Sequence, residues 1–421
     1  MVEIASETIA VHGSTCRLCG SSLWHSFVDL GASPLCESFL SAEQLNHAEP
    51  FYPLDVRVCA ECLLVQLDEY VAPDKIFTDY AYFSAYSDSW VAHARAYAEA
   101  MVTRLDLSPK SLVVELASND GYLLQHFVAR GIPVLGIDPA ANVAEAARTR
   151  GVETLVAFFG EDLARRVVED GRRADLLVAN NVLAQVPNLN DFVAGMEVVL
   201  APDGIATVEV PHLVRLIEGV QFDTIYHEHF SYFSLTTLVR LFDSHQLEVF
   251  DVEELASHGG SLRLYLKRRG DERHQVSARL RALLQRERKG GYDRLEGYAG
   301  FDASVREAKW ALLELLIGLR RAGKRIAGYG APGKGNTLLN YSGIRTDLIE
   351  YTVDRNPWKQ GKFLPGTRIP IHPPERIAET RPDYIVILPW NLKEEIADQL
   401  SYVREWGGQL IVPIPNAEVL P

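Results

Sequence analysis

The stretch Ser111–Leu124, with the sequence SLVVELASNDGYLL, decides the fold of the longest part of the chain. It joins a short apolar run to a turn of small and polar residues and then to apolar positions with helical spacing. This order is typical of a strand buried on both faces followed by a helix. Three further apolar runs continue the pattern: PVLGID (133–138), ADLLVANN (174–181) and GIATVEVP (204–211). Strands that alternate with helices predict an α/β domain with a doubly wound parallel sheet.

A second series of the same kind occupies the last quarter of the chain. Its apolar runs are RIAGYG (325–330), LIEYTVD (348–354), DYIVILP (383–389) and GQLIVPIP (408–415). They predict a second, smaller α/β domain, preceded by a long helix from Asp302 to Arg321. Residues 263–289, between the two series, are rich in Arg and Lys with interspersed acidic residues. We interpret them as a solvated helical surface.

The first 75 residues differ from the rest because they hold all five cysteines and little helical periodicity. Cys16-Arg-Leu-Cys19 and Cys59-Ala-Glu-Cys62 form two CxxC pairs, and two such turns can supply the four thiolates of a tetrahedral zinc site. Four protein ligands leave no open position, so the predicted zinc ion is structural. The alternatives are one redox-active pair or two unrelated pairs. We interpret Cys36 as a small buried hydrophobic residue.

Composition and length bound the remaining possibilities. Among 421 residues, 42 are Lys or Arg and 56 are Asp or Glu, which gives a formal charge of −14. An acidic chain lacks the cationic surface on which nonspecific nucleic-acid binding depends. No apolar run approaches the ~20 residues of a membrane helix, and the first residues lack the basic start and apolar core of an export signal. We therefore expect a cytoplasmic protein with neither a nucleic acid nor a membrane as partner.

These patterns together predict three domains. The first is a zinc-binding domain over residues 1–75. A central α/β domain over residues 76–265 and a smaller C-terminal α/β domain over residues 266–421 follow it.

Small and polar residues follow the predicted central strands. The loop Glu115-Leu-Ala-Ser-Asn-Asp-Gly121 follows the first strand, and Asp138 ends the second, where a carboxylate can bind two ribose hydroxyls. The loop lacks the GxGxxG pattern, so an adenosyl group without phosphate, as in S-adenosylmethionine, fits better than a dinucleotide. A turn without any ligand is the alternative. The predicted cofactor residues are Glu115, Ala117, Ser118, Asn119, Gly121, Asp138, Pro139, Asn180 and Asn181.

The segment Tyr226-His-Glu-His-Phe-Ser-Tyr-Phe-Ser234 is the densest cluster of ionisable groups in the chain. The zinc protease motif needs two histidines four residues apart on one helix. These are two apart, so we exclude that class. Because imidazole titrates near neutral pH, the cluster can instead remove and relay a proton. The alternative is an aromatic packing segment with solvated polar groups.

The segment Gly328-Tyr-Gly-Ala-Pro-Gly-Lys-Gly-Asn-Thr337 is similar to a phosphate-binding loop. Gly335 stands where such a loop needs a Ser or Thr for Mg²⁺, so we exclude ATP hydrolysis. Lys334 and the start of a helix still form a cradle for a pyrophosphate. The turn Asp354–Gly361 ends the next strand on the same edge. A tight turn with a solvated lysine is the alternative.

Taken in chain order, these motifs resemble the sugar C-methyltransferases of antibiotic deoxysugar pathways. The resemblance covers nearly the whole chain through both CxxC pairs, DYAYFSAYSDSW (79–90), VELASNDGYLL (114–124), YHEHFSYFS (226–234), GYGAPGKGNTLLNY (328–341) and VDRNPWKQGKFLPGTRIPI (353–371). It implies a zinc domain over the active site, a Rossmann-like class I methyltransferase domain and a C-terminal Rossmann-like domain that helps to hold the substrate. The implied reaction moves a methyl group from S-adenosylmethionine to C3 of a TDP-linked 4-keto-deoxysugar by way of an enolate.

The resemblance also implies roles for individual residues. His229 would be the base, with Tyr226 and Glu228 beside it, and Tyr80 would face the sugar. In NNVLAQVPNLNDF (180–192), Gln185 stands where the family has a histidine. Glutamine cannot titrate, so we expect only a hydrogen bond to the keto oxygen there. The expected catalytic residues are His229, Glu228, Tyr226, Tyr80 and Gln185, and the expected substrate-binding residues are Tyr82, Tyr86, Lys334, Asn336, Thr337, Arg355 and Asn356.

Two other functions stay open at this point. A nucleotide-sugar 4-ketoreductase would use NADPH in the same cleft, instead of or alongside methylation, and Gln185 is the feature that keeps this alternative. A zinc-containing nucleotide-binding module without activity would leave the cluster around His229 without a role. Either an amino or a hydroxyl group at C3, and either a monomer or an oligomer, is compatible with the sequence.

Overall fold

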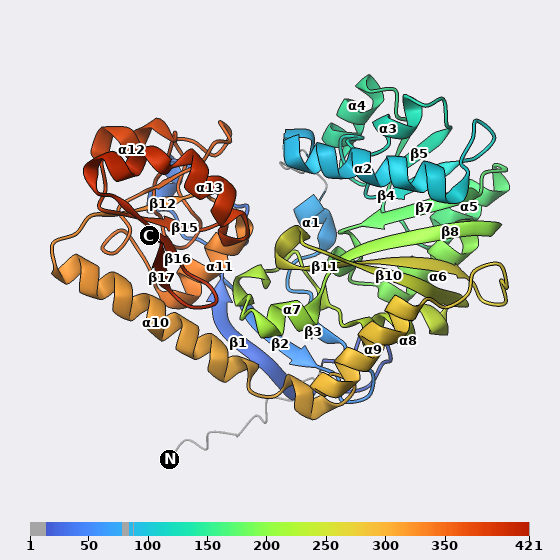
Figure 1. Ribbon diagram of the computed structural model, residues 1–421, viewed down its shortest axis with the longest axis horizontal. Helices are drawn as coiled ribbons and strands as arrows, with labels where there is room; N and C mark the ends of the chain where they lie inside the picture. Colours follow the sequence, from blue (N-terminus) through green and yellow to red (C-terminus); the bar gives the residue numbers. More distant parts are fainter. Residues whose placement is uncertain (1–13, 78–83, 87, 421) are drawn as a thin grey trace, which may run out of the picture.

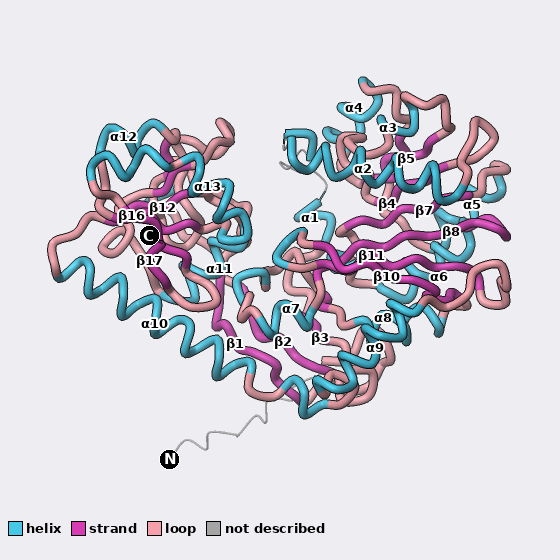
Figure 2. The backbone as a smooth tube through the Cα atoms, in the orientation of Figure 1, coloured by secondary structure: helices cyan, strands magenta, loops and turns pink. Residues whose placement is uncertain are grey.

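The computed structural model describes residues 14–77, 84–86 and 88–420, which form three β-sheets (Figures 1 and 2). Figure 1 shows a large and a small α/β lobe, with the N-terminal sheet between them near their base. The long helix α10 (Phe301–Arg321) runs along this base toward the small lobe. Within the described ranges, no helix is both long and apolar enough to cross a membrane.

The large lobe is built on a seven-stranded sheet in the order β10-β11-β8-β7-β4-β5-β6. The pairs among β4, β5, β6, β7 and β8 are all parallel, as the alternating pattern predicts. The strands are β4 (Val113–Leu116), β5 (Val134–Asp138), β6 (Thr154–Val156), β7 (Ala174–Asn180), β8 (Leu200–Pro211), β10 (Leu247–Leu255) and β11 (Ser261–Arg268).

Helices cover both faces of this sheet, because neighbouring residues of a strand point to opposite sides. Val113 packs in one core cluster with Tyr97 and Phe127, whereas Val114 packs in another with Phe192. The sheet is therefore doubly wound, which confirms the predicted fold class. The helices of this lobe are α2 (Asp88–Leu105), α3 (Gln125–Val128), α4 (Ala141–Thr149), α5 (Glu161–Glu169), α6 (Leu189–Val199), α7 (Leu213–Glu218), α8 (Leu235–Ser244) and α9 (Ala278–Gly290).

The prediction of a solvated helical surface over residues 263–289 is wrong for its first residues. They belong to β11, which pairs antiparallel with β8 and β10 and crosses the predicted domain boundary after residue 265. Arg263 and Lys267 are only 6% and 4% exposed there. Arg263 donates to the Glu209 carboxylate at 2.9 Å, and Lys267 donates to two backbone carbonyls. Such partners make buried cations tolerable, and no local pattern reveals them.

The small lobe is a six-stranded sheet in the order β14-β13-β12-β15-β16-β17, parallel except for the last pair. It confirms the predicted second α/β series, although the run 348–354 contributes only a two-residue strand. Its strands are β12 (Ile326–Tyr329), β13 (Thr352–Val353), β14 (Ile371–His372), β15 (Tyr384–Ile387), β16 (Gln409–Val412) and β17 (Glu418–Leu420). Its helices, besides α10, are α11 (Gly333–Ser342), α12 (Glu375–Thr380) and α13 (Lys393–Gln399).

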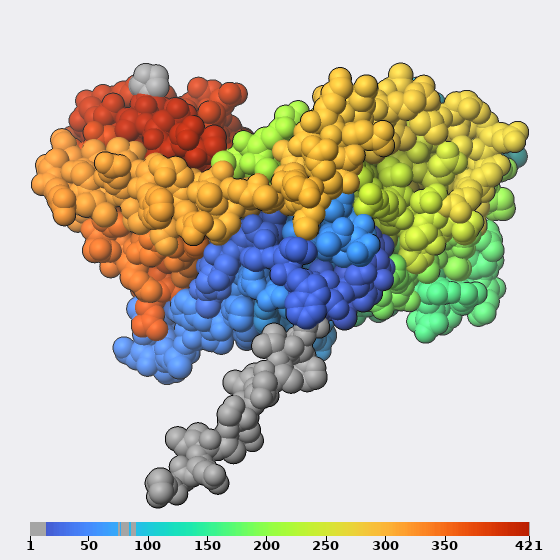
Figure 3. Space-filling view, turned by 90° about the horizontal axis from the view of Figure 1, so that it is seen from below, coloured from blue at the N-terminus to red at the C-terminus, as the bar shows by residue number. Residues whose placement is uncertain are grey.

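The N-terminal sheet is antiparallel and joins the two lobes. Its strands, in order, are β1 (His25–Ser33), β2 (Tyr52–Val58), β3 (Val65–Leu67) and β9 (Ser231–Tyr232), and α1 (Pro73–Phe77) follows β3 in the chain. Val56 and Val65 share a hydrophobic core with Val305 and Leu338 of the small lobe. Figure 3 shows this N-terminal part lying against both lobes. Because β9 is part of the segment Tyr226–Ser234, the sheet also holds that segment in place.

Candidate active site

A cavity of about 590 Å³ lies where the three sheets meet. Its wall combines residues at the carboxyl ends of β4, β5 and β7 with the segment before β9 and the start of α11. Cys36 and Glu37 of the N-terminal part complete it. Open α/β sheets bind ligands beyond the carboxyl ends of their strands, so this cavity is the candidate active site.

The four predicted zinc ligands come together outside this cavity. The Sγ atoms of Cys16, Cys19, Cys59 and Cys62 lie within 4.8 Å of one another. The side-chain N–H of Gln66 donates to the Cys16 sulfur at 3.2 Å, a contact that suits a metal-bound thiolate. This donor set fits one tetrahedral Zn²⁺ and leaves no position for a substrate, so the zinc site is structural.

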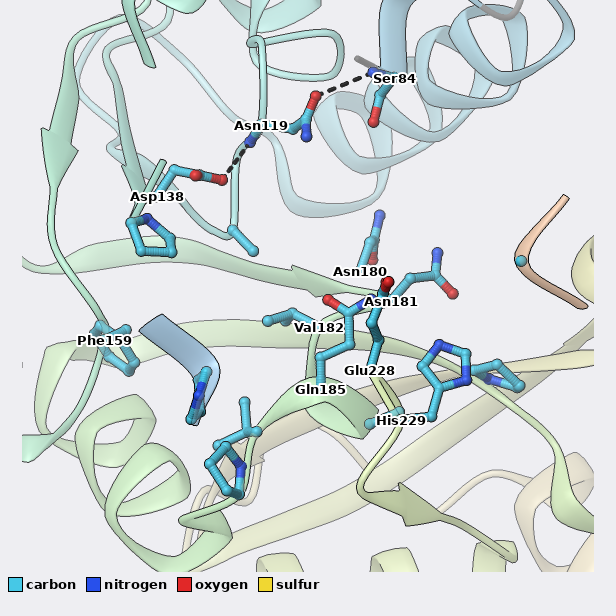
Figure 4. A pocket seen from close by; sticks show the side chains of 18 of the residues that line it. Ser84, Asn119, Asp138, Phe159, Asn180, Asn181, Val182, Gln185, Glu228 and His229 are labelled. Atoms are coloured by element: carbon cyan, nitrogen blue, oxygen red, sulfur yellow. Dashed lines mark hydrogen bonds between the residues drawn. The ribbon is translucent and has the colours of Figure 1, made fainter. Parts of the chain in front are cut away.

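Asp138 holds the loop that follows β4. Its two carboxylate oxygens accept hydrogen bonds from the backbone N–H groups of Asn119 and Ala140, both at 2.9 Å. The Asn119 side chain in turn accepts from the Ser84 N–H at 3.0 Å (Figure 4). Burial raises the pKa of Asp138. The carboxylate lines the cavity, and its remaining lone pairs can accept hydrogen bonds from hydroxyls of a ligand.

Backbone strain and unpaired amides mark the same edge of the sheet. Ala117, Asn119 and Asn181 adopt positive φ angles of 56°, 48° and 56°. Such conformations cost about 1–3 kcal/mol each and gather at ligand sites. Both amide atoms of Asn181 and the Oδ1 atom of Asn180 are buried without a hydrogen-bond partner among the described residues. Buried amides normally have partners, so the end of β7 is prepared for a polar ligand.

Three predicted cofactor residues support this edge from behind the cavity wall. Glu115 is buried within β4, and the side chain of Ser118 is fully buried. A Cβ atom at Gly136 would lie 2.4 Å from Ser118 Oγ, so a side chain there would displace the loop. Gly121 turns the loop with a φ of 77°. The other six residues line the cavity: Ala117, Asn119, Asp138, Pro139, Asn180 and Asn181.

An aromatic part of the wall was missed in the sequence. Phe158 and Phe159 follow β6, and Phe159 meets Phe192 edge to face with ring centroids 5.3 Å apart. Trp90 stacks on Tyr122 with centroids 6.2 Å apart. Apolar aromatic walls of this kind suit a flat heterocycle. The Phe-Phe pair was the available signal, but the short run that forms β6 was not recognised as a strand.

His229 presents its imidazole to the cavity from the segment before β9 (Figure 4). Its Nδ1 lies 3.1 Å from the Thr224 carbonyl oxygen. A carbonyl only accepts, so Nδ1 carries the proton and the lone pair is on Nε2. Burial, together with the nearby His258 and Lys334, lowers the pKa of His229 to about 4. His227, in contrast, places its Nε2 3.0 Å from the carbonyl oxygen of Pro53 in the N-terminal sheet.

Tyr226 and Glu228 flank His229. The ring centroids of Tyr226 and His229 are 4.2 Å apart. Glu228 is buried and accepts a hydrogen bond from the Cys36 thiol at 3.3 Å. Burial and the charge of Glu228 raise the pKa of Cys36, so the thiol stays protonated and keeps donating. The prediction that Cys36 is a small buried residue is confirmed, and the residue also lines the cavity.

Gln185 and His258 complete this end of the cavity. Gln185 ends the 3₁₀ turn Leu183–Gln185 after β7 and lines the wall. His258, which no motif indicated, lines the wall from the turn between β10 and β11. Its φ is 54°, and its ring meets Trp90 edge to face with centroids 5.4 Å apart. The run His258-Gly-Gly260 was the local signal that could have singled it out, because paired glycines indicate a special turn.

Of the predicted substrate residues in the small lobe, only Lys334 lines the cavity. Asn336 and Thr337 are 1% exposed within α11, and the Thr337 hydroxyl donates to a backbone carbonyl. Arg355 and Asn356 lie in the turn after β13, away from the cavity wall. Tyr80 and Tyr82 lie outside the described residues, and so does the side chain of Tyr86.

Family models match three successive parts of the chain. Residues 16–77 match a putative zinc binding domain, and residues 90–252 match a methyltransferase domain. Residues 256–415 match the C-methyltransferase C-terminal domain.

Curated relatives and solved structures extend these matches. The C-methyltransferase NovU of Streptomyces niveus is 39% identical over 405 residues, which cover 96% of each chain. A ubiquinone biosynthesis O-methyltransferase of Rhodopseudomonas palustris is 23% identical over 26% of this chain and 46% of its own length. The crystal structure of the PH0226 protein from Pyrococcus horikoshii covers 48% of this chain and 100% of its own, with 15% identity and a TM-score of 0.37. That of the 1,6-didemethyltoxoflavin-N1-methyltransferase from Burkholderia thailandensis covers 49% and 95%, with 17% identity and a TM-score of 0.35.

Proposed function

Since this chain belongs to the C-methyltransferase family and is an S-adenosylmethionine-dependent enzyme, we propose that it methylates C3 of a TDP-linked 4-keto-deoxysugar. The observation that carries this proposal is the orientation of His229. Its Nδ1–H is held by the Thr224 carbonyl, which leaves Nε2 to accept a proton in the cavity that also contains the edge at Asp138. A carbon next to a ketone becomes a nucleophile only after such a base removes its proton.

The central edge of the cavity supplies groups that fit S-adenosylmethionine. Asp138 can accept hydrogen bonds from ribose hydroxyls, and Phe158 and Phe159 offer apolar surface to an adenine ring. The unpaired amide of Asn181 can bind polar atoms of the cofactor or of the sugar. When bound, the cofactor would supply an electrophilic methyl group, with a neutral thioether as the leaving group.

The reaction that follows from this arrangement begins at the base. Nε2 of His229 removes the proton from C3, and the electron pair of that bond moves toward O4 to give an enolate. Tyr226 and Gln185 line the same cavity, and their neutral donor groups can hydrogen-bond to O4 as charge develops there. Cys36 and Glu37 close the cavity from the N-terminal part, which reduces the access of water to the enolate.

The wall opposite the cofactor edge suits the diphosphate of a nucleotide-sugar. Gly333 begins α11 and lines the cavity, so backbone N–H groups of the first turn are available there. Lys359 also lines this wall, with its Nζ donating to the Ala331 carbonyl at 2.9 Å. The C-terminal lobe would therefore bind the anionic part of the substrate while the base faces the sugar.

The proposal is tested by incubating the zinc-loaded enzyme with a TDP-linked 4-keto-deoxysugar and methyl-labelled S-adenosylmethionine. We expect the label on C3 of the sugar, located by mass spectrometry and NMR, and label transfer slowed by about 10²–10⁴-fold in the H229N variant. Label on an oxygen or nitrogen atom would contradict the proposal.

The ketoreductase alternative has no comparable support. The matched domains are methyltransferase domains, and the loop after β4 lacks the glycine pattern of a dinucleotide site. The same sugar incubated with NADPH serves as the control. We expect no NADPH oxidation, and oxidation without transfer of label would favour the reductase.

A further inference from the structure

The base lies at a junction between two cavities. The main cavity adjoins a smaller one of about 50 Å³, and the residues that line both include Tyr226, His229, His258 and Lys334. Lys334 therefore lines the same small cavity as the predicted base. A lysine that only binds the diphosphate of the substrate would not need to line the small cavity that His229 also lines.

A set of side chains from two lobes holds the Lys334 ammonium. Its Nζ donates to Asn391 Oδ1 at 2.8 Å and lies 4.8 Å from the centroid of the Trp390 ring. The indole N–H of Trp390 donates to Asp223 Oδ2 at 2.6 Å. A preformed cradle of this kind fixes the direction of a flexible side chain before any ligand arrives.

Asp223 supplies the opposite charge. It is 0% exposed, and its Oδ1 atom has no hydrogen-bond partner among the described residues. Burial lowers the pKa of Lys334, and the charge of Asp223 opposes this effect, so Asp223 helps to keep the ammonium protonated. Asp223 directly precedes Thr224, whose carbonyl orients His229. One turn, Phe222–Thr224, thus positions both the base and the counter-ion of the lysine.

We propose that Lys334 is a catalytic residue whose ammonium stabilises the enolate oxygen O4, and that Asp223 and Trp390 position it for this task. This inference rests on the proposed function. It replaces the expectation that Lys334 binds the pyrophosphate. A fixed cation beside the place where negative charge develops, in a site with little water, stabilises the transition state more than the neutral ketone.

The electrons and the proton balance without a further reagent. The C3–H proton moves to His229 Nε2, the C3–H electron pair forms the C3=C4 bond, and the C4=O π pair becomes the O4 oxyanion beside Lys334. With the cofactor bound, C3 would bond to its methyl carbon while the S–CH₃ bond breaks with its electron pair on sulfur, and the C4=O bond would re-form. The proton leaves His229 to solvent, and Lys334 is an ammonium throughout.

The test separates enolate formation from diphosphate binding. Deuterium exchange at C3 of a TDP-linked 4-keto-deoxysugar is followed by NMR in D₂O at saturating substrate, with S-adenosylhomocysteine present. We expect the exchange rate at C3 to be at least about 100-fold lower with K334M than with the wild type, and to recover in part with K334R. The affinity of K334M for TDP alone, measured by calorimetry, should differ from that of the wild type by less than about threefold.

A second readout does not depend on turnover. Because the Lys334 cation lowers the pKa of His229, the pKa should rise in K334M, as followed by the His229 ring resonance that H229N identifies. Asp223 loses its counter-ion in K334M, so the double variant K334M/D223N is measured as well, with thermal unfolding as the check on folding. It should exchange as slowly as K334M.

Two results would overturn the inference alone. One is a loss of TDP affinity of about tenfold or more while the exchange rate at saturation is unchanged. The other is a K334M variant with an unchanged exchange rate and an unchanged His229 pKa. A wild-type enzyme that neither exchanges C3–H nor methylates the sugar would instead overturn the proposed function, and the inference with it.

Discussion

The thiol cluster and the junction around His229 are both groups of ionisable side chains. In the first the side chains surround one common point, and in the second they line a cavity. The four Sγ atoms lie within 4.8 Å of one another and point at a common centre. At the junction, His229 and Lys334 each have a partner on one side, Thr224 and Asn391, and a cavity on the other.

This difference teaches that the surroundings of a group, more than its type, decide between a structural and a chemical role. Four soft ligands around one point leave room for an ion and nothing else. A base and a cation that are fixed from behind can act on a molecule whose charge changes as it reacts. The predictions below break one or the other arrangement.

The largest effect is expected from the thiol cluster. Changing Cys59 to Ser removes one of four zinc ligands, and structural zinc sites contribute on the order of 10 kcal/mol of binding free energy. We expect loss of bound zinc, measured by elemental analysis, and loss of cooperative thermal unfolding of the N-terminal part. Cys36→Ser is the matched control and should keep full zinc content, because Cys36 lies outside the cluster. Full zinc in C59S would refute the four-thiol site.

A smaller but still large effect is expected at the base. His229→Asn keeps much of the shape and removes the proton acceptor, which should lower the methylation rate by about 10²–10⁴-fold. Steady-state assays with labelled methyl donor measure this loss. His227→Asn is the matched control within the segment Tyr226–His229, because His227 faces Pro53 and not the cavity. It should affect thermal stability more than turnover, and equal losses in the two variants would contradict the assignment of the base.

An intermediate effect is expected at the cofactor edge. Asp138→Ala removes the proposed acceptor for ribose hydroxyls and also frees the N–H groups of Asn119 and Ala140. The dissociation constant of S-adenosylhomocysteine should rise about 10–100-fold, by calorimetry, since hydrogen bonds to charged groups contribute about 1.5–3 kcal/mol. Affinity for TDP is the control and should stay unchanged. A matching loss of TDP affinity would indicate that the change disturbs the whole cavity.

The smallest effect concerns pH. The pKa of His229 is lowered to about 4, so its neutral, basic form predominates above that value. We therefore expect protonation of His229 to lower kcat/KM only below about pH 5, rather than near the ordinary histidine pKa of about 6.5. A pH profile of the wild-type enzyme measures this limb. A limb near 6 would instead point to Asp223, whose pKa burial raises to about 6, and D223N would then remove it.

Strands made of uninterrupted apolar runs could be predicted, and strands with charged side chains could not. The runs that became β4, β5, β7 and β8 have the composition of strands buried on both faces. β11 carries Arg263 and Lys267, whose burial depends on Glu209 and on carbonyl groups elsewhere in the chain. A local pattern contains no information about such distant partners.

Residues that local motifs singled out lie where a site could use them. The thiols of the CxxC pairs gather in one cluster, and Asp138 and His229 line the same cavity. The contact of Cys36 with Glu228 was missed because the two residues are 192 positions apart. The aromatic wall was missed because Phe159, in the loop before α5, meets Phe192 of α6 only in the folded chain. The cradle of Lys334 joins Asp223 to Trp390, which are 167 positions apart.

The sequence by itself determined the alternation of strands and helices, the ligand type of the metal site and the family of chemistry, because each depends on period or side-chain type within a few neighbouring residues. The tertiary structure alone decided that His229 faces the cavity while His227 does not, and that Lys334 lines the same small cavity as His229. Both placements depend on how the loops of three sheets are packed together. Such packing is set by contacts between residues far apart in the sequence.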